Sequence, residues 1–365
     1  MIELVDLHKQ YLSIKDEIDS AIKVVIDSSA FVGSKTVERF EGAFAEYTGA
    51  KHCIAVANGT DALELAIEAL GIKDKYIVVP AMTATPTVEA VVRTGNAPIF
   101  CDTDETCTLN IEKFEEIIGE YPVSAVIPVH LYGAPANMYS IKRIACKNNI
   151  VIIEDCAQAH GTKFDGIHVG TTGEAGCFSF YPGKNLGAFG DAGAIITNSD
   201  NMFNHLRMLR DHGRVGKFAH AIVGRNSRMD GIQAAILEVK LLHLDKWISA
   251  RQKNAQYYNQ RFIGYGVLPT WTYFPKNQYT YHQYPILVLD RDRLWQSLLN
   301  RGIRAGMHYP FILPSLPCYQ KYAMDSYISA RAIAEHEISL PVHEMLSQED
   351  LDVVINVVEE HYDRV

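Results

Sequence analysis

Short apolar runs alternate with segments of helical periodicity between about residue 50 and residue 200. The runs that predict strands are rich in β-branched and aromatic residues and lie at 53–56, 76–79, 97–102, 124–129, 150–155 and 176–181. The intervening segments, such as DALELAIEALG and YSIKRIACKNN, repeat apolar residues at the spacing of a helix face. Strands that alternate with helical crossovers form a mostly parallel sheet, so the pattern predicts an α/β fold. A run at 192–197 follows closely and suggests a neighbouring antiparallel strand.

The pattern changes after residue 229, where a long helical stretch extends to about Phe262. Its apolar stripe contains Ile232, Ala235, Ile236, Val239, Leu242 and Trp247. A helix of this length can bridge two domains, and we expect the boundary inside it, near residue 240. Beyond the boundary the pattern predicts a strand, a helix, a strand and a final helix, at 282–290, 291–302, 303–310 and 347–362. The expected organisation is a large α/β domain (1–240) and a smaller α+β domain (241–365).

Composition and charge narrow the class of protein. Hydrophobic residues make up 48% and charged residues 21%, as in ordinary globular proteins. No apolar run is long enough to cross a bilayer and the acidic N-terminus does not resemble a signal peptide, so we expect a cytoplasmic protein with no membrane role. The seven cysteines form no CxxC pair, which argues against a disulfide framework and a zinc site, and we expect no metal. A net charge of −9 without clustered basic residues argues against nucleic acid, although a locally positive pocket can still bind a small anion.

Polar residues stand where predicted strands end, which is the edge at which α/β sheets bind ligands. Asn58, Gly59 and Thr60 lie between a strand and a helix, where free backbone N–H groups suit a phosphate. Capping of the helix by Asn58 or Thr60 is the alternative explanation. Glu154 and Asp155 end a strongly apolar strand, where a carboxylate needs a partner, and an ordinary salt bridge would also provide one.

One lysine lies in the glycine-rich segment FSFYPGKNLGAFGDAGAIIT, at 178–197. Lys184 comes five residues after Ser179, another small polar residue near a strand end, and no Ser or Thr follows it as a P-loop requires. A solvated loop lysine is the common alternative. A further polar group, Asn226 and Arg228, precedes the long helix, for which Asp230 is a candidate N-cap.

Together these residues supply the three groups that pyridoxal 5′-phosphate (PLP) requires. The amine of Lys184 can form a Schiff base with the aldehyde of PLP, and the carboxylate of Asp155 can keep the pyridine nitrogen protonated. Gly59, Thr60 and Ser179 can anchor the phosphate. Because burial near a cationic ring disfavours an ammonium group, the same lysine can also act as a base.

Five segments resemble, in order, the DegT/StrS family of sugar aminotransferases, a branch of the fold-type-I PLP enzymes. They are residues 31–66 (FVGSK to LELA), 152–161 (IIEDCAQAHG), 178–194 (FSFYPGKNLGAFGDAGA), 226–235 (NSRMDGIQAA) and 308–310 (HYP). The resemblance runs nearly end to end. It implies a fold-type-I aminotransferase with a mostly parallel central sheet and a smaller C-terminal domain.

The resemblance also implies roles for single residues. Lys184 would form the Schiff base, Asp155 would contact the pyridine nitrogen, and Gln158 would hydrogen-bond the phenolic oxygen of the ring. The residues that hold the phosphate would be Gly59, Thr60 and Ser179 of one subunit and Asn226 of its partner. The active unit would therefore be a homodimer. The chain departs from the family at Ala84 in TATPT, where many relatives have an aromatic residue that stacks on the cofactor ring.

The implied reaction is a ping-pong transamination in which L-glutamate donates its amino group to a nucleotide-linked keto sugar. The segments around Lys184 look most like those of enzymes that aminate C3 of a dTDP-linked 3-keto-6-deoxyhexose. Tyr181, His308 and Tyr309 are candidate ligands of sugar hydroxyls or of the pyrophosphate, and each also fits as a packed aromatic residue with a satisfied polar tip.

Other functions stay open at this point. A C4-aminating enzyme would carry the same PLP chemistry. A PLP-dependent sugar dehydratase is less favoured because such relatives replace the lysine with histidine, and a non-catalytic sensor is expected to lose site residues. A nicotinamide dehydrogenase is disfavoured because GKNLGAFG lacks the GxGxxG spacing.

Overall fold

The computed structural model describes residues 1–263, 277–324 and 327–362, and a seven-stranded sheet lies at its centre. In spatial order the strands are β1 (His52–Val56), β9 (Gly193–Thr197), β8 (Ala175–Ser179), β5 (Val151–Asp155), β4 (Val123–Val126), β2 (Tyr76–Pro80) and β3 (Ala97–Cys101). Strand β9 pairs antiparallel with β1 and β8, whereas the pairs from β8 to β3 are parallel. The predicted α/β class and the antiparallel strand at 192–197 are therefore confirmed.

Helices bury the sheet on both faces, which explains why its strands are apolar at successive positions. One face packs against α4 (Gly59–Ala69), α5 (Thr85–Arg93) and α8 (Asp200–Leu209). The other face packs against α3 (Lys35–Thr48), α6 (Ile111–Glu120), α7 (Met138–Asn148) and the long helix α9 (Gly231–Arg261). Neighbouring residues of β5 show the division, because Ile153 belongs to the first core and Ile152 to the second. A short hairpin, β6 (Lys163–Phe164) and β7 (Ile167–His168), follows β5.

Helix α9 packs against α2 (Lys15–Ser28) and α3, and α1 (Leu7–Ser13) precedes α2. The predicted apolar stripe is wrong at one position, because Leu242 is 80% exposed while Lys240 is 1% exposed. The buried positions shift around α9 because the helix contacts different elements along its length, so one stripe does not describe it. Asp230 occupies the N-cap position, as predicted, although its side chain makes no capping hydrogen bond. Within the described residues, no helix is both long and apolar enough to span a bilayer.

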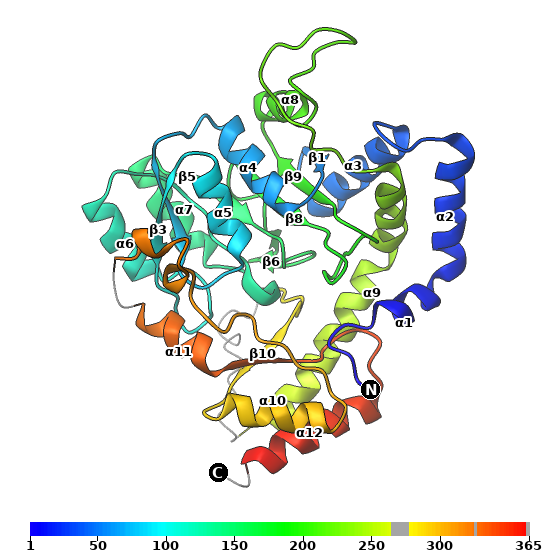
Figure 1. Cartoon of the computed structure of the whole chain (residues 1–365), viewed down its shortest axis with the longest axis vertical. Coiled ribbons are helices and arrows are strands. Elements are labelled where there is room, and N and C mark those ends of the chain that lie inside the picture. The colour runs from blue at the N-terminus through cyan, green and yellow to red at the C-terminus, as the bar shows by residue number, and fades with distance from the viewer. Residues whose placement is uncertain (264–276, 325–326, 363–365) are drawn as a thin grey trace.

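The C-terminal part is a second α+β unit around the end of α9 (Figure 1). Its two-stranded sheet pairs β10 (Tyr284–Leu287) antiparallel with β11 (Glu337–Leu340), and α10 (Arg291–Asn300) and α12 (Gln348–Tyr362) share its core. Helix α11 (Ile328–His336) connects to β11 but buries its apolar residues in the core of the large sheet. The predicted strand at 303–310 is wrong: this segment makes single bridges from Ile303 to Ile2 and from Gly306 to Ser339. It does not continue as a strand because the N–H of His308 donates to the Glu337 side chain instead of to a backbone carbonyl.

The core also changes along α9, since Ile248 packs with the large sheet and Ala255 with the C-terminal sheet. The N-terminus lies beside the C-terminal unit, where Ile2 packs against its core (Figure 1). The division into domains 1–240 and 241–365 stays a prediction.

The segment that follows α8 projects away from the body of the molecule (Figure 1). Two large apolar side chains lie on it in solvent, Phe218 at 87% exposed and Val223 at 94% exposed. Asn226 lies at the C-terminal end of this segment and pairs through its backbone with Asp211.

Candidate active site

The ends of two neighbouring parallel strands place two predicted site residues at the same edge of the sheet. Asp155 is the last residue of β5, and Ser179 is the last residue of β8. The turn before α4 lies against this edge: a Cβ added to Gly59 would lie 2.7 Å from the Cβ of Ser179. Gly59 therefore has no room for a side chain, and its backbone lies directly beside Ser179.

The start of α4 offers free hydrogen-bond donors. Asn58 is the N-cap, and its Oδ1 accepts the N–H of Asp61 at 2.8 Å, so the capping explanation is confirmed for Asn58. The N–H groups of Gly59 and Thr60 lie in the first turn, where a helix provides no internal partner. Ser179 Oγ accepts the N–H of Tyr181 at 3.3 Å, which leaves the hydroxyl proton free to donate. These groups fit an anion such as a phosphate.

Glu154 and Asp155 are neighbours in β5 but have different surroundings. Both oxygens of Glu154 are occupied, because they accept hydrogen bonds from His130 Nε2 at 3.0 Å and from the backbone N–H groups of Gly170, Thr172 and Gly173. Burial opposes ionisation of Glu154, but the hydrogen bonds from His130 and the backbone lower its pKa. The alternative explanation, in which a carboxylate at the end of this strand only forms an ordinary pair with a neighbour, therefore applies to Glu154.

Asp155 keeps accepting capacity on the side of the site. Its carboxylate is buried and accepts Thr87 Oγ1 at 2.8 Å and the N–H of Ala157 at 3.1 Å. Burial raises its pKa, while these two donors and the charge of Lys184 favour the ionised form. A buried carboxylate of this kind can accept the N–H of a protonated pyridine ring.

Lys184 lies in a tight loop after β8, near Asp155. Burial lowers its pKa to about 8 and the charge of Asp155 opposes the shift, so the neutral amine is accessible near neutral pH. Among the described residues, none accepts a hydrogen bond from its Nζ. The loop requires a glycine at Gly187, where an added Cβ would lie 2.2 Å from the carbonyl oxygen of Pro182. The buried Nζ of Lys240 donates to the carbonyl oxygen of Gly187 at 2.8 Å and holds this loop from α9.

Gln158 connects two loops at the site. Its Oε1 accepts the N–H of Tyr132 at 2.6 Å, so the amide nitrogen faces the other way and donates to the hydroxyl of Tyr309 at 3.3 Å. Burial, together with the charge of Asp155, raises the pKa of Tyr309 to about 12, so the phenol stays protonated. The structure thus places Gln158 and Tyr309 together, next to Asp155.

His308 lies beside Tyr309 and near Lys184. Burial lowers its pKa to about 4, and the charge of Lys184 lowers it further in the same direction, so the imidazole is neutral. Its Nδ1 hydrogen-bonds Ser339 Oγ at 2.9 Å, and its carbonyl oxygen accepts the hydroxyl of Tyr132. The segment 308–310 therefore forms one side of the site although no strand leads into it.

Three residues singled out from the sequence add no side-chain hydrogen bond to this cluster within the part of the chain that the structure describes. Tyr181 is 59% exposed, and Asn226 is exposed on the projecting segment. Ala84 is the N-cap residue of α5 and offers only a methyl group where an aromatic ring was expected from the resemblance.

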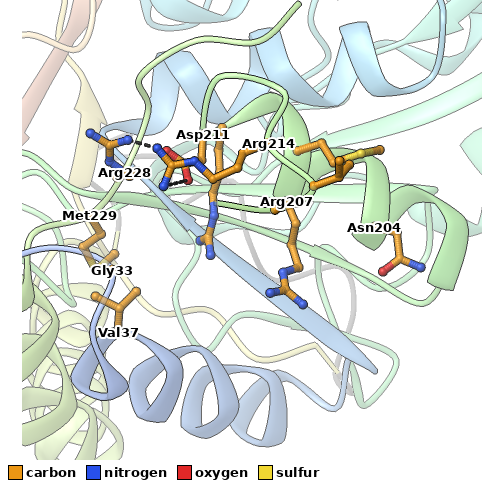
Figure 2. Close-up of a pocket in the computed structure, with 12 residues that line it drawn as sticks. Gly33, Val37, Asn204, Arg207, Asp211, Arg214, Arg228 and Met229 are labelled. Atoms are coloured by element: carbon orange, nitrogen blue, oxygen red, sulfur yellow. Dashed lines mark hydrogen bonds and ion pairs between the residues drawn. The ribbon is translucent and has the colours of Figure 1, made fainter. Parts of the chain in front are cut away.

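An arginine-lined pocket of about 540 Å³ lies apart from Lys184 and Asp155, between α8, the start of α3 and the segment after α8. Figure 2 shows that its arginines come from two stretches of chain, and that Asp211 lies between Arg214 and Arg228. Arg228 Nη1 pairs with Asp211, and Arg214 Nη1 lies 3.5 Å from the other carboxylate oxygen. Arg207 and Arg210 also line the pocket, so its surface is positive in an acidic protein.

Three contributors to the site were not identified from the sequence. Thr87 supports Asp155, and Thr83 Oγ1 lies 3.1 Å from Thr87 Oγ1. Their spacing of four residues at the start of a helix was a signal that could have been read from TATPT. Tyr132, which has a positive φ of 60°, gave no such signal because its contacts are with residues distant in the chain.

A free lysine beside a buried aspartate, with unfilled N–H donors at a helix start, is what PLP requires of a protein, and the residues present fit it. The sheet order and this cluster define a fold-type-I PLP aminotransferase. The family model described as the DegT/DnrJ/EryC1/StrS aminotransferase family matches residues 12–359. The chain belongs to this family.

Similar proteins carry both enzymatic and regulatory names. The chain is 37% identical to a "dTDP-3-amino-3,6-dideoxy-alpha-D-galactopyranose transaminase" of Aneurinibacillus thermoaerophilus, with 98% of this chain and 99% of that protein covered. It is also 37% identical to a "Pleiotropic regulatory protein" of Geobacillus stearothermophilus, over 99% of this chain and 98% of that protein. The solved structure of Streptomyces venezuelae DesV with a ketimine intermediate superposes with a TM-score of 0.95, at 36% identity over 100% of this chain and 99% of DesV.

Proposed function

We propose that this aminotransferase transfers the amino group of L-glutamate to C3 of a nucleotide-linked keto sugar, a dTDP-3-keto-6-deoxyhexose, in the cytoplasm. The observation that supports the chemistry is the free Lys184 amine, with a pKa of about 8, next to the buried carboxylate of Asp155. The sugar assignment is supported by the resemblance around Lys184 and by the 3-aminating relative at 37% identity.

Each residue of the cluster has a defined task in this proposal. PLP, when bound, supplies an aldehyde that takes up amines and a ring that accepts electrons. Lys184 Nζ would hold the cofactor, and its amine could move the proton at Cα of glutamate. Asp155 would accept the N–H of the protonated ring, and Gln158 Nε2 would donate to the phenolic oxygen. Gly59, Thr60 and Ser179 bind the phosphate through their N–H and hydroxyl groups.

The sugar nucleotide would contact the other side of the site. Tyr309 keeps its proton and can donate to a sugar oxygen, and His308 lies beside it. Tyr181 is exposed and can reach the sugar or the pyrophosphate without disturbing the core.

We further propose that the active unit is a homodimer in which Asn226 of one subunit reaches the phosphate bound by the other. The exposed Phe218 and Val223 of the projecting segment support this, because large apolar side chains in solvent are typical of a surface that a partner covers. The arginine-lined pocket lies on the same segment and suits the diphosphate of the sugar nucleotide.

The activity is tested by giving the purified protein PLP, L-glutamate and a matched pair of dTDP-sugars, one 3-keto and one 4-keto. We expect 2-oxoglutarate and a 3-amino sugar, with the higher kcat/KM for the 3-keto compound. Preference for the 4-keto sugar would move the assignment to C4. Conversion of the PLP absorbance by glutamate without any sugar product would redirect the search to another acceptor, and no response to glutamate would favour a regulatory protein.

The shared site is tested by mixing two inactive variants, Lys184→Ala and Asn226→Asp. A mixed dimer has one site with both native residues, so some activity should return. If mixed dimers form, as shown by differently tagged subunits, and no activity returns, then Asn226 does not act across the interface.

A further inference from the structure

The imidazole of His308 is held by a chain of hydrogen bonds that ends at a buried carboxylate. Its Nδ1 bonds Ser339 Oγ at 2.9 Å, and Ser339 Oγ bonds Glu337 Oε1. The backbone N–H of His308 donates to Glu337 Oε2 at 2.6 Å, so both oxygens of Glu337 are directed at this unit. Glu337 and Ser339 are fully buried in β11.

The direction of each proton in this chain follows from the ionised state of Glu337. A carboxylate only accepts, so the hydroxyl proton of Ser339 must point to Glu337. The remaining lone pairs of Ser339 Oγ then face His308, and Nδ1 has to donate to them. A neutral imidazole carries one N–H, so a proton on Nδ1 leaves Nε2 as a bare acceptor.

We propose that Glu337, acting through Ser339, fixes the Nδ1–H tautomer of His308 and thereby presents Nε2 as an acceptor for a hydroxyl group of the sugar. Glu337 and Ser339 are positioning residues in this proposal, and the identity of the ligand rests on the proposed sugar aminotransferase function. Among the described residues, no donor or acceptor contacts His308 Nε2. His308 as a residue is only half-buried, which leaves a side of it open to a ligand.

The direction of Nε2 is fixed as well as its protonation. Gly306 and Ser339 exchange two backbone hydrogen bonds, of 3.0 and 2.8 Å, which align the segment before His308 with β11. A Cβ added to Gly306 would lie 2.6 Å from Cε1 of His308, so this edge of the ring lies against the glycine and has no room to swing toward it. On the opposite side, Tyr132 donates to the carbonyl oxygen of His308. The backbone of His308 is therefore held from both halves of the molecule, and the imidazole is held from the side of β11.

Replacing Glu337 with glutamine should reverse the direction of the hydrogen bonds that run from residue 337 through Ser339 to Nδ1 of His308. The amide oxygen has to face the N–H of His308, because two donors cannot face each other. The amide NH₂ then donates to Ser339 Oγ, whose own proton turns to Nδ1 of His308. The imidazole must respond by placing its proton on Nε2, which becomes a donor. Glu337→Gln thus changes what the site offers to the sugar without changing any side chain that touches it.

Protonation of Glu337 should have the same effect as this substitution. Burial raises the pKa of Glu337 to about 7, while the hydrogen bonds from Ser339 and His308 and the charge of Arg291 oppose the shift. Below that pH the carboxyl group donates to Ser339, and Nε2 gains the proton. The other titratable or charged groups around Glu337 in the described residues are Arg291, Cys107, Tyr132, His308 and Tyr309. The pKa values of four of these groups are shifted away from neutral pH, namely those of Cys107, Tyr132, His308 and Tyr309. We therefore expect Glu337 to be the group that titrates near pH 7.

The direct test reads the tautomer in the PLP-loaded enzyme without any sugar. Histidine labelled with ¹⁵N is introduced, and long-range ¹H–¹⁵N correlations distinguish a protonated ring nitrogen from a bare one; His308→Gln assigns the signal among the 14 histidines. The pKa of Glu337 is about 7, so the wild type is measured above pH 7.5, where this carboxyl group is ionised. We expect a bare Nε2 in the wild type and a protonated Nε2 in Glu337→Gln. A bare Nδ1 in the wild type, or an unchanged tautomer in Glu337→Gln, would overturn the proposal.

The functional test separates sugar binding from the glutamate half-reaction. In Glu337→Gln the KM of the keto sugar should rise roughly tenfold to a hundredfold, as expected when a buried hydrogen-bonding group loses its complement. The rate with glutamate alone should stay unchanged. The wild-type KM should rise as the pH falls through about 7, and the KM of the variant should lack this dependence. An equal pH dependence in both enzymes would contradict the role of Glu337.

A matched variant controls for the loss of a buried charge. Glu344→Gln neutralises another buried carboxylate of the C-terminal unit, which is 3% exposed and pairs with Arg251 at 2.9 Å. It has no contact with His308 and should leave the tautomer and the sugar KM unchanged. If Glu337→Gln does not fold, Ser339→Ala interrupts the same chain, and the wild-type spectrum still decides the tautomer. If no keto sugar is turned over, the proposed function fails while the tautomer measurement stands on its own.

Discussion

The proposed cofactor side and the proposed sugar side of the site are built in different ways. On the cofactor side, Asp155 and Ser179 end neighbouring strands of one sheet, and Lys184 follows within the next loop. On the sugar side, His308 lies on an irregular segment that is held by β11 from one direction and by Tyr132 from the other. The first side inherits its geometry from the sheet, whereas the second depends on contacts between residues far apart in the chain.

The two sides also differ in whether the role of a residue follows from its type or from its hydrogen-bond partners. On the proposed cofactor side, the chemical role can be inferred from the residue type alone, because an amine is a nucleophile and an ionised carboxylate is an anion. For the imidazole of His308, the residue type alone does not say which ring nitrogen donates and which accepts. The hydrogen bonds to Ser339 and Glu337 decide this. Substitutions on the two sides should therefore fail in different ways: loss of chemistry on one, and changed sugar preference on the other.

The largest effect is expected for Lys184→Ala. Turnover should fall by several orders of magnitude, because the amine that binds the cofactor and moves the proton is gone. The absorbance of lysine-bound PLP should disappear, while circular dichroism and the Tm should match the wild type because the side chain is not part of the apolar core. Near-normal turnover in this variant would remove the basis of the proposed function.

Asp155→Asn should also reduce turnover by orders of magnitude, since it keeps the shape but removes the charge opposite the ring nitrogen. The neighbour in β5 provides the comparison. Glu154→Gln should lower the free energy of unfolding by about 1–3 kcal/mol, because a buried hydrogen-bonded group is disturbed, and should retain turnover per folded molecule. Steady-state kinetics and urea unfolding of both variants would show whether the two carboxylates have separate roles.

A smaller effect is expected for Thr87→Val, which removes the hydroxyl that donates to Asp155 at 2.8 Å. A donor stabilises the ionised carboxylate, so its loss should raise the pKa of Asp155 further. The acid limb of the kcat–pH profile should move to higher pH, with turnover at neutral pH reduced by roughly tenfold. Thr83→Val, which contacts Thr87 but not Asp155, should leave the acid limb in place; equal shifts in both variants would point to general repacking.

The smallest effect concerns the support of the lysine loop by α9. Burial lowers the pKa of Lys240 to about 8, so the unfolded chain binds its proton more tightly than the folded chain does. The wild type should therefore gain stability as the pH rises from about 8 toward the ordinary lysine value of 10.5. Lys240→Met should show less of this gain, and the exposed Lys246→Met should behave like the wild type when Tm is measured across this range.

The sequence was sufficient for the sheet and for the clustering of the residues at its strand ends, because both follow from local patterns. Strand ends are marked by the switch from apolar to polar residues, and parallel strands bring those ends to one edge. Asp155 and Ser179 were placed in this way, and the structure brings Gly59 into contact with Ser179. The residue roles themselves stay predictions until the variants are measured.

The rest could not be read from the pattern because it depends on contacts between distant segments. The segment 303–310 alternates like a strand, but the N–H of His308 is taken by the Glu337 side chain. Leu242 reads as part of an apolar stripe, but the contacts of α9 change along its length and leave this residue at 80% exposure. In both cases the outcome depends on how elements far apart in the sequence pack, about which periodicity gives no information.

The way in which His308 is held has a consequence for the evolution of new specificities. Its N–H and its carbonyl oxygen carry the contacts with Glu337 and Tyr132, and these atoms are present in every amino acid except for the missing N–H of proline. A mutation at position 308 can thus exchange the side chain while the backbone stays anchored. The side chain at position 308 can therefore vary while its backbone stays in place, which makes this position a suitable first target for libraries that seek enzymes for other sugars.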